Sequence, residues 1–329
     1  MKTFAFAAIL GSALALSEIE ASFMAYITQF NKSYKNAEEY EMRLREFAVK
    51  HVKIQESNAD PTLTYKAGHN KFSDWTDAEY KAMLTYKPSD EEREYTKKIV
   101  SAIAPIDWRN TTNGLNCMNP IQDQGQCGSC WAFSTQGSME TNECIANGGT
   151  LQKYSEQQLV DCVKTCYGCN GGLTQRACYY LQTHNEILES DYIYLATDTA
   201  CAYDSKPHTN VICGQYAWMT PNDPASMQNA LNAGVISVSI QADQFCFQTY
   251  TSGIFNNPKC GTSLDHATVV VGWGTDDASG QDYWIMRNSW GTSWGESGYM
   301  KIEISTTVNS GAGYCGIQSE PIQLYPNTN

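Results

Sequence analysis

The chain has 329 residues, enough to bury a substantial core in one large domain or two ordinary ones. The formal net charge of −13 argues against a nucleic-acid-binding protein, which would need a basic face. It suits either plain solubility or an acidic compartment in which some carboxylates are neutralised.

Residues 1–17 have the form of a secretory signal. Lys2 provides the positive start, an apolar run follows, and Ala13-Leu14-Ala15 has the small-x-small form of a cleavage site. The run is too short to span a membrane, and no later stretch reaches the ~18 consecutive apolar residues that a span requires. We therefore expect a protein without a membrane span that enters an oxidising compartment, where cysteines pair by default.

A charged region with helical patterning runs from Ser17 to about Leu84. Its apolar residues recur at intervals of three and four, which places them on one face of each helix. Because so small a helical segment rarely folds alone, we expect this face to pack on the rest of the chain. Residues 86–98 lack core material and carry a run of charges, which predicts an exposed linker that is easily cut. Asn31 and Asn110 stand in N-x-S/T triplets, whose glycosylation stays open.

Glycine, tyrosine, tryptophan and cysteine become frequent beyond Pro105, and all thirteen cysteines lie from Cys117 onward. Helical patterns come first, over residues 130–147, after the capping residue Ser155 and over 175–181. Short β-rich runs follow at 235–240, 267–271, 283–286 and 299–304. This order predicts an α+β protein with a helical half, a sheet or barrel half and a cleft between them.

The segment from Gln124 to Phe133 carries the first chemical motif. Two cysteines stand three residues apart after a glycine-rich turn, and an apolar run compatible with a helix follows Cys130 directly. A thiol at a helix N-terminus feels the positive end of the helix dipole and unpaired backbone N–H groups, which favour its thiolate. Cys130 is therefore a candidate nucleophile that needs a base.

His266 is the best-placed candidate for this base. It precedes a short apolar strand, whereas the other histidines of the cysteine-rich region stand in polar, loop-like sequence. Asn288, at the end of another strand, provides an amide that would orient the imidazole without neutralising its charged form. Gln124 provides a second amide, which together with the Cys130 backbone N–H would stabilise an oxyanion. Each residue alone has a structural interpretation, but four roles in matching contexts favour catalysis.

These motifs resemble the papain family of cysteine proteases. The run Cys127-Gly-Ser-Cys130-Trp matches the family signature around the nucleophile, which expects histidine and asparagine ~130–150 residues downstream. His266 falls inside that window and Asn288 lies slightly beyond it. The resemblance covers residues 105–320. It implies a two-lobed α+β fold with a helical left lobe, a β-barrel-like right lobe and an active-site cleft between them.

The resemblance implies acyl transfer through a thioester on Cys130. A Cys130 thiolate and a His266 imidazolium would form an ion pair, the sulfur would attack the scissile carbonyl, and His266 would protonate the leaving amine. A papain-family cysteine has a pKa near ~3–4, so such a thiolate survives in an acidic lumen. Trp290 would shield the hydrogen bond between Asn288 and His266 from water.

The same resemblance identifies residues 18–103 as an inhibitory propeptide of the cathepsin L-like type and residues 104–329 as the peptidase domain. Two interrupted motifs carry it: Glu39, Arg43, Phe47, Ile54 and Asn58, with Lys50 in place of the family's first asparagine, and Gly68, Asn70, Phe72 and Asp74. In the family the propeptide packs on the enzyme and its tail crosses the cleft in the non-productive direction. We expect acid to protonate carboxylates that hold the propeptide to the enzyme, Asp74 among them, and to permit cleavage near residues 101–105.

For the cysteines, the resemblance implies three disulfides, Cys127–Cys169, Cys162–Cys201 and Cys260–Cys315, with Cys130 as the odd thiol. The remaining six could form three further bridges, and their pairing stays open: Cys117, Cys144, Cys166, Cys178, Cys213 and Cys246.

The positions that align with the family's substrate cleft predict specificity. They are Gly171, Gly172, Leu173, Thr174, Ser239, Leu264, Ala267, Trp290 and Glu320. The S2 pocket receives the side chain before the residue at the cut bond (P2), and its walls are largely apolar. Glu320 falls where cathepsin B has a glutamate at the pocket floor, so we expect it to pair with a P2 arginine and to turn aside for leucine or phenylalanine. A solvated glutamate near the C-terminus is the alternative.

The segment between Gly172 and Tyr192 is too short for the occluding loop of cathepsin B, which favours an endopeptidase. An inactive homologue that acts as an inhibitor or binding protein would usually have lost its nucleophile or base, and both are present. A structural zinc site would use two Cys-x-x-Cys pairs, but their gap exceeds the usual ~15–20 residues. We expect no metal or cofactor, and a monomer that acts on proteins and peptides. We expect the protein to lie in a lysosome, digestive vacuole or other acidic endosomal compartment, or to be secreted.

Overall fold

The computed structural model describes residues 18–89, 91–95, 104–110 and 114–328. The predicted secretory signal lies outside these ranges, and so do residues 101–103 of the predicted cleavage window. Within the described ranges we find no helix with both the length and the apolar character that crossing a membrane requires.

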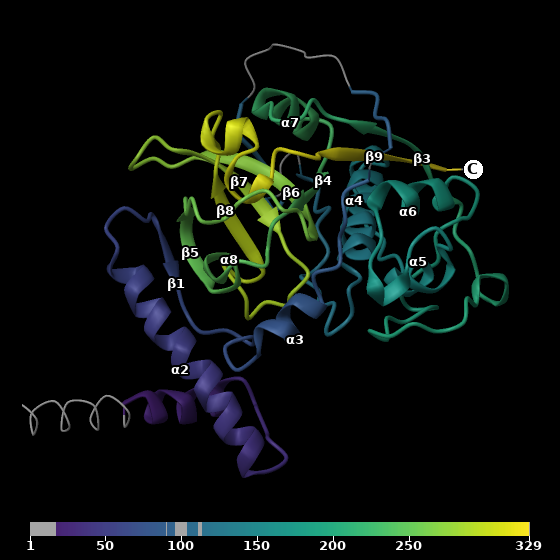
Figure 1. Cartoon of the computed structure of the whole chain (residues 1–329). Coiled ribbons are helices and arrows are strands. Elements are labelled where there is room, and N and C mark those ends of the chain that lie inside the picture. The colour runs from purple at the N-terminus through teal and green to yellow at the C-terminus, as the bar shows by residue number, and fades with distance from the viewer. Residues whose placement is uncertain (1–17, 90, 96–103, 111–113, 329) are drawn as a thin grey trace, which may run out of the picture.

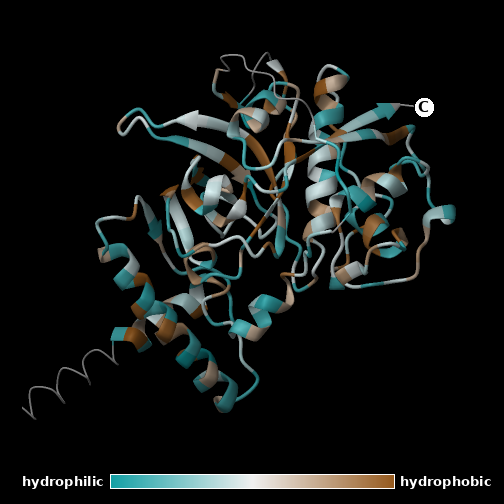
Figure 2. Ribbon diagram, turned by 45° about the horizontal axis from the view of Figure 1, so that its top comes forward, coloured by the Kyte–Doolittle hydropathy of each residue, from teal (hydrophilic) through white to brown (hydrophobic). Residues whose placement is uncertain are grey.

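Helix α2, Ala37–Ala59, is the main element of the N-terminal region (Figure 1). Polar and apolar residues alternate along it (Figure 2). On its apolar face Phe47 packs with Phe23 from the helical residues 18–29, while Ile54 joins the core of the sheet lobe. The predicted packing of this region on the rest of the chain is confirmed.

Strand β1, Tyr65–Ala67, and helix α3, Asp77–Ala82, complete the described part of this region. β1 pairs antiparallel with β5, Tyr250–Phe255, at the edge of the main sheet. Thr76 and Glu79 close a capping box that begins α3. The N-terminal region is thus joined to the sheet lobe by backbone hydrogen bonds as well as by apolar contacts.

The helical lobe holds α4, Cys130–Ala146, α5, Glu156–Cys162, and α6, Thr174–Leu181 (Figure 1). These helices agree with the three predicted ones. Helix α4 is buried over residues 130–144 because α5 and α6 pack against it and strands of the sheet cover it as well. Its polar side chains therefore need internal partners, and Ser134, for example, donates to the carbonyl of Thr268 at 2.7 Å.

Within the described residues the strands form one open sheet in the order β1-β5-β8-β7-β6-β4-β9-β3, with β2 paired to β6. The strands not yet defined are β2 Ile106–Asp107, β3 Val211–Trp218, β4 Ile236–Ile240, β6 His266–Thr275, β7 Asp282–Arg287, β8 Tyr299–Glu303 and β9 Ile322–Thr328. The remaining helices are α7 Pro224–Leu231 and α8 Phe245–Gln248, with 3-10 turns at Gly168–Asn170, Tyr203–Ser205, Val308–Gly311 and Tyr314–Gly316. The four predicted strands correspond to β4, β6, β7 and β8, so the two-lobed α+β organisation is confirmed.

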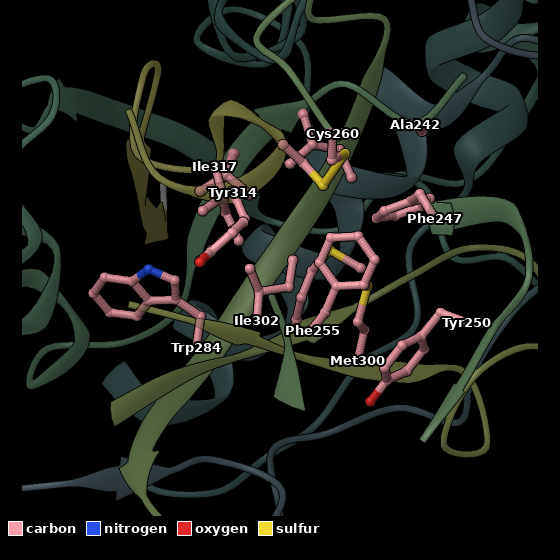
Figure 3. Close-up of a cluster of buried hydrophobic side chains, with 14 of the residues drawn as sticks. Ala242, Phe247, Tyr250, Phe255, Cys260, Trp284, Met300, Ile302, Tyr314 and Ile317 are labelled. Atoms are coloured by element: carbon pink, nitrogen blue, oxygen red, sulfur yellow. A yellow bond between two sulfur atoms is a disulfide. The ribbon is translucent and has the colours of Figure 1, made fainter. Parts of the chain in front are cut away.

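The largest apolar core fills the sheet lobe (Figure 3). Trp284, Met300 and Ile302 are fully buried there, and the disulfide of Cys260 lies at its margin (Figure 3). Burying a large apolar side chain contributes roughly 1.5–3 kcal/mol, so this cluster gives the lobe much of its stability.

Five disulfides are present among the described residues. They include the three implied bridges, Cys127–Cys169, Cys162–Cys201 and Cys260–Cys315, together with Cys117–Cys144 and Cys178–Cys213. Two of the three further bridges that the other six cysteines could form are therefore present, and Cys166 and Cys246 remain buried free thiols, as Cys130 does. Cys166 belongs to the core of the helical lobe and Cys246 to that of the sheet lobe, so their sulfurs cannot meet.

Candidate active site

Cys130 is the first residue of α4, as predicted, and its side chain is fully buried. Burial raises the pKa of the Cys130 thiol to about 11. Backbone N–H groups of Ala267 and Trp131 act in the opposite direction, but the loss of water outweighs them. The thiol is therefore neutral in this form of the chain.

His266 begins β6 and Asn288 directly follows β7, and these two strands pair antiparallel. The imidazole Nε2 donates to Asn288 Oδ1 at 2.8 Å, which leaves Nδ1 without a hydrogen-bond partner among the described residues. Burial lowers the pKa of His266 to about 4. Burial thus favours the neutral form of both Cys130 and His266 while the N-terminal region covers the site.

Gln124 is held in one orientation by Ser289, whose hydroxyl donates to the amide oxygen at 2.7 Å. The amide nitrogen donates to the Cys127 carbonyl at 2.9 Å and lies 3.5 Å from the carbonyl oxygen of Met83. A carbonyl of the N-terminal region therefore sits at the donor that we expect to face an oxyanion. The sequence did not predict that Ser289 orients Gln124, because no sequence pattern distinguishes a serine with this role.

Trp290 stacks on the imidazole of His266, with ring centres 4.7 Å apart and planes 26° from parallel. Phe72 of the N-terminal region makes an edge contact with the same indole at 5.2 Å. Trp290 is fully buried, and its indole covers the imidazole that bonds to Asn288. It also connects the predicted Gly-x-Asn-x-Phe-x-Asp motif directly to the site.

Residues 83–86 of the N-terminal region cross the site. The Tyr86 N–H donates to the carbonyl of Asp265 at 3.0 Å, and the Thr85 hydroxyl donates to the carbonyl of Gly128 at 2.8 Å. A Cβ atom added at Gly171 would lie 2.3 Å from the Thr85 carbonyl oxygen, so only glycine allows this close approach. The chain's own N-terminal region thus occupies the predicted cleft.

The Tyr86 side chain fills the predicted S2 pocket. It packs with Leu173, Leu264 and Ala267, and its hydroxyl donates to Glu320 Oε2 at 2.5 Å. The other residues predicted there line the same cavity: Thr174 and Ser239. Glu320 points into the pocket, with 10% of its side chain exposed. The prediction of an exposed linker from residue 86 onward is wrong at its start, because Tyr86 is buried by these walls.

The substrate-cleft glycine Gly172 supports this pocket from behind. A Cβ atom at this position would lie 2.5 Å from the Trp131 ring and 2.8 Å from the free sulfur of Cys166. The backbone therefore lies directly on the core of the helical lobe, and a larger residue would push it toward the cleft.

Asp74 binds inside the N-terminal region. Its carboxylate accepts from Tyr26 at 2.7 Å, from Lys32 at 2.8 Å and from Tyr34 at 3.0 Å. The expectation that Asp74 is among the carboxylates that hold the propeptide to the enzyme is wrong, because all three of these partners belong to the N-terminal region itself.

Arg43 and Lys50, which belong to the propeptide motif on α2, bind the segment that contains Asp74. Arg43 reaches both carboxylate oxygens of Glu79 at 2.5 and 2.7 Å and also donates to the Asp74 carbonyl at 3.0 Å. Lys50, which departs from the family pattern, donates to the carbonyl of Trp75 and is nearly buried. The lysine therefore supplies a donor to the loop between β1 and α3.

Other members of the two motifs tie the structure together. Asn58 exchanges two hydrogen bonds with the backbone of Ala67, at 2.8 and 2.9 Å, and Glu39 accepts from the Lys35 N–H at 2.8 Å. Across the junction with the sheet lobe, the Gly68 N–H donates to the Thr249 carbonyl at 2.8 Å. Asn70 makes the shortest of these bonds, 2.6 Å, to the carbonyl of Gln248.

A disulfide removes two of the four cysteines that the alternative structural zinc site would need. Cys127 and Cys169 are bonded to each other, so neither is available as a thiolate. In the part of the chain that the structure describes, no group of three or more His, Cys, Asp and Glu side chains is placed to hold a metal ion.

Comparison with known proteins places these features in a family. Residues 103–325 match the model of the papain family cysteine proteases, and residues 23–80 match that of the cathepsin propeptide inhibitor domain. The chain is 37% identical over 319 residues to digestive cysteine proteinase 1 of Homarus americanus, covering 93% of this chain and 95% of that one. It is 38% identical over 312 residues to the probable cysteine protease RD21C of Arabidopsis thaliana, covering 92% of this chain but 67% of the longer relative. Digestive procathepsin L 3 of Tenebrio molitor superposes with a TM-score of 0.81 at 32% identity, over 93% of this chain and 99% of that one.

Proposed function

Because the chain belongs to the papain family of cysteine proteases, as its motifs predicted, we propose that it is an endopeptidase made as an auto-inhibited precursor. The observation that supports this proposal is that residues 83–86 of the chain cover one site. That site contains Cys130, His266, Asn288 and Gln124. The nucleophile, the base and the oxyanion donor lie together, and the chain's own propeptide covers them.

The mechanism requires the propeptide to leave. Water then returns to the site, and the desolvation that keeps Cys130 and His266 neutral is relieved. His266 Nδ1, which has no partner in the covered site, takes the thiol proton, and the thiolate attacks the scissile carbonyl carbon. Gln124 Nε2 and the Cys130 N–H donate to the oxyanion, and His266 gives its proton to the leaving amine. Water then hydrolyses the thioester, and the thiol is restored.

The proposed precursor has a signal at 1–17, a propeptide at 18–103 and a peptidase domain at 104–329, and it acts as a monomer. The proposed compartment is an acidic one on the secretory route, either lysosomal, digestive or extracellular. N-terminal sequencing of acid-processed protein tests the boundary: a mature start within residues 101–105 supports it, and a start far from that window contradicts it.

For specificity we propose that Glu320 selects the P2 residue. Its carboxylate points into a pocket that Leu173, Thr174 and Ser239 also line, which favours the pocket role over that of a solvated side chain. Glu320→Gln is expected to lose cleavage of peptides with arginine at P2 while retaining cleavage of peptides with leucine at P2. An equal loss on both substrates counts against this role.

Labelling by an epoxide-type thiol-protease inhibitor tests the function itself. Acid-activated wild-type protein is expected to label and to cleave peptides internally, the unprocessed precursor to label weakly, and Cys130→Ala to do neither. Cys166→Ala, which removes another buried free thiol, serves as the control and is expected to label normally. If activated wild-type protein neither labels nor cleaves, the chain is an inactive homologue that acts as an inhibitor or binding protein.

A further inference from the structure

The guanidinium of Arg93 lies in a largely buried compartment beside the predicted S2 pocket. Glu320 and Trp218 form the walls of this compartment. The Arg93 Nη2 atom is 2.8 Å from Glu320 Oε1, and only 8% of the Arg93 side chain is exposed. Its central carbon lies 4.2 Å from the centre of the Trp218 ring. A carboxylate and an indole face together suit a guanidinium, which forms directed hydrogen bonds at its edge and stacks on its face.

The walls of this compartment belong to the peptidase domain, whereas Arg93 belongs to the propeptide. Trp218 ends β3, and Glu320 stands two residues before Ile322, which begins β9. The two strands pair antiparallel with Trp218 opposite Ile322. Strand pairing within the peptidase domain therefore keeps the backbone of Trp218 close to that of Glu320, and in the precursor Tyr95 of the propeptide also forms a parallel bridge with Trp218.

Loss of the propeptide leaves Glu320 without its partners. Among the described residues its carboxylate bonds only to the Tyr86 hydroxyl and to Arg93, and both depart together. A carboxylate at the base of a pocket is stabilised by a cation that enters from outside. The vacated compartment therefore favours a positively charged group.

The compartment is continuous with S2. One small cavity is lined by Leu173 and Ser239 from the S2 walls and by Trp218 and Glu320, and Tyr86 and Arg93 of the propeptide line it as well. Tyr86 fills the apolar part of S2, and Arg93 lies over Trp218. A long P2 side chain that follows the path of Tyr86 thus reaches Glu320 beside the indole.

We propose that Trp218 is a specificity-determining residue, which forms with Glu320 a guanidinium-binding compartment in S2 that favours P2 arginine over P2 lysine. This inference rests on the proposed function. A guanidinium pairs with the carboxylate and stacks on the indole at once, whereas an ammonium is a compact, strongly hydrated charge that gains less from the ring. Arg93 occupies the compartment in the precursor and shows the geometry that a substrate arginine would adopt.

The test measures kcat/KM of the mature enzyme on peptides that differ only at P2, with arginine, lysine or leucine. Wild-type enzyme is expected to favour arginine over lysine by about tenfold, and Trp218→Leu to lose about tenfold on P2 arginine alone. Trp218→Phe keeps an aromatic ring with a weaker face, so its kcat/KM on the P2 arginine peptide is expected to lie between those of wild-type enzyme and Trp218→Leu. If Trp218→Leu does not fold, the comparison of Trp218→Phe with wild-type enzyme tests the proposal. Tyr179→Leu, an exposed aromatic of the same lobe, is the control.

A uniform loss on all three peptides would overturn the proposal, because it would show that Trp218 serves packing alone. Wild-type enzyme that cleaves the P2 leucine peptide but shows equal kcat/KM on the P2 arginine and P2 lysine peptides would overturn it as well. If wild-type enzyme cleaves none of the peptides and does not react with the epoxide inhibitor, the proposed function fails instead.

Discussion

Lys71 of the propeptide lies with its ammonium nitrogen 2.6 Å from both carboxylate oxygens of Asp123. Asp123 directly precedes Gln124, and its backbone forms an antiparallel bridge with Trp290. One ion pair therefore connects the propeptide loop to the two segments that carry the oxyanion donor and the cover of the histidine. This contact, together with Glu320, places carboxylates of the peptidase domain rather than Asp74 at the propeptide junction.

Asp123→Asn is expected to speed acid-triggered processing of the precursor up to about fivefold, since a partly exposed ion pair contributes about 0.2–1 kcal/mol. The asparagine oxygen still accepts the hydrogen bond from the Gly125 N–H, so the turn is retained. The measurement is the rate of precursor loss at pH 5, followed on gels. Asp60→Asn, an exposed change within the propeptide, is the control, and equal rates for the two variants would rule out a role for the ion pair.

Two propeptide histidines form a pair that acid disrupts. His51 Nδ1 and His69 Nε2 are 2.9 Å apart, which requires one proton between them, and His69 Nδ1 lies 3.0 Å from the Ser73 hydroxyl. Burial, with His51 and the Lys50 ammonium nearby, lowers the pKa of His69 to about 4 from its ordinary 6.5. The unfolded propeptide takes up this proton first, so the stabilisation is complete above pH 6.5 and is lost as the pH falls toward 4.

His69→Gln is therefore expected to move the midpoint of acid-triggered processing to lower pH, because glutamine bonds to both neighbours without titrating. Processing is measured from pH 4 to 7.5, with His184→Gln as a control in the helical lobe. Identical midpoints for wild-type protein and His69→Gln would show that the histidine pair does not sense the pH.

The covered nucleophile predicts a large change in thiol reactivity. With its pKa raised to about 11, Cys130 of the precursor is expected to alkylate slowly at pH 6 and faster as the pH rises. Removal of the propeptide is expected to raise the rate at pH 6 at least tenfold, as water and His266 stabilise the thiolate. Mass spectrometry of the Cys130 peptide after iodoacetamide treatment measures both rates. Asn288→Ala is expected to lower the rate in the mature enzyme, and equal rates before and after processing would contradict this account.

Glu186 makes the helical lobe sensitive to pH in the opposite direction. It is fully buried, accepts from Gln136 at 2.8 Å, and its other oxygen has no hydrogen-bond partner among the described residues. Burial raises the pKa of Glu186 to about 8. The folded state keeps a proton that the unfolded state releases, so this contribution to stability is present below pH 4.5 and is lost as the pH rises through 8.

Glu186→Gln is expected to stabilise the fold by roughly 1–4 kcal/mol at pH 7.5 and to change little at pH 4.5. Thermal unfolding of the Cys130→Ala precursor at the two pH values measures the difference without self-digestion. Glu56→Gln, at an exposed site, is the control. A stability gain of equal size at both pH values would contradict the ionisation argument.

Local patterns were sufficient for much of this protein. The start of α4 at Cys130 follows from a glycine-rich turn before an apolar run, and the helix after Ser155 follows from its cap, which accepts a hydrogen bond from the Gln158 N–H. Short β-rich runs located the four strands. These features depend on neighbours within a few residues, so the sequence alone determined them, and the motifs then determined the chemistry.

Tertiary structure alone decided what fills the cleft. Nothing local marks Tyr86 or Arg93 as buried, since charged residues surround them, and their environment comes from Glu320 and Trp218 far along the chain. The pKa values of Cys130 and His266 likewise depend on which distant segment excludes water. Burial and pairing of this kind arise from strand register and lobe packing, which bring together residues that share no sequence pattern.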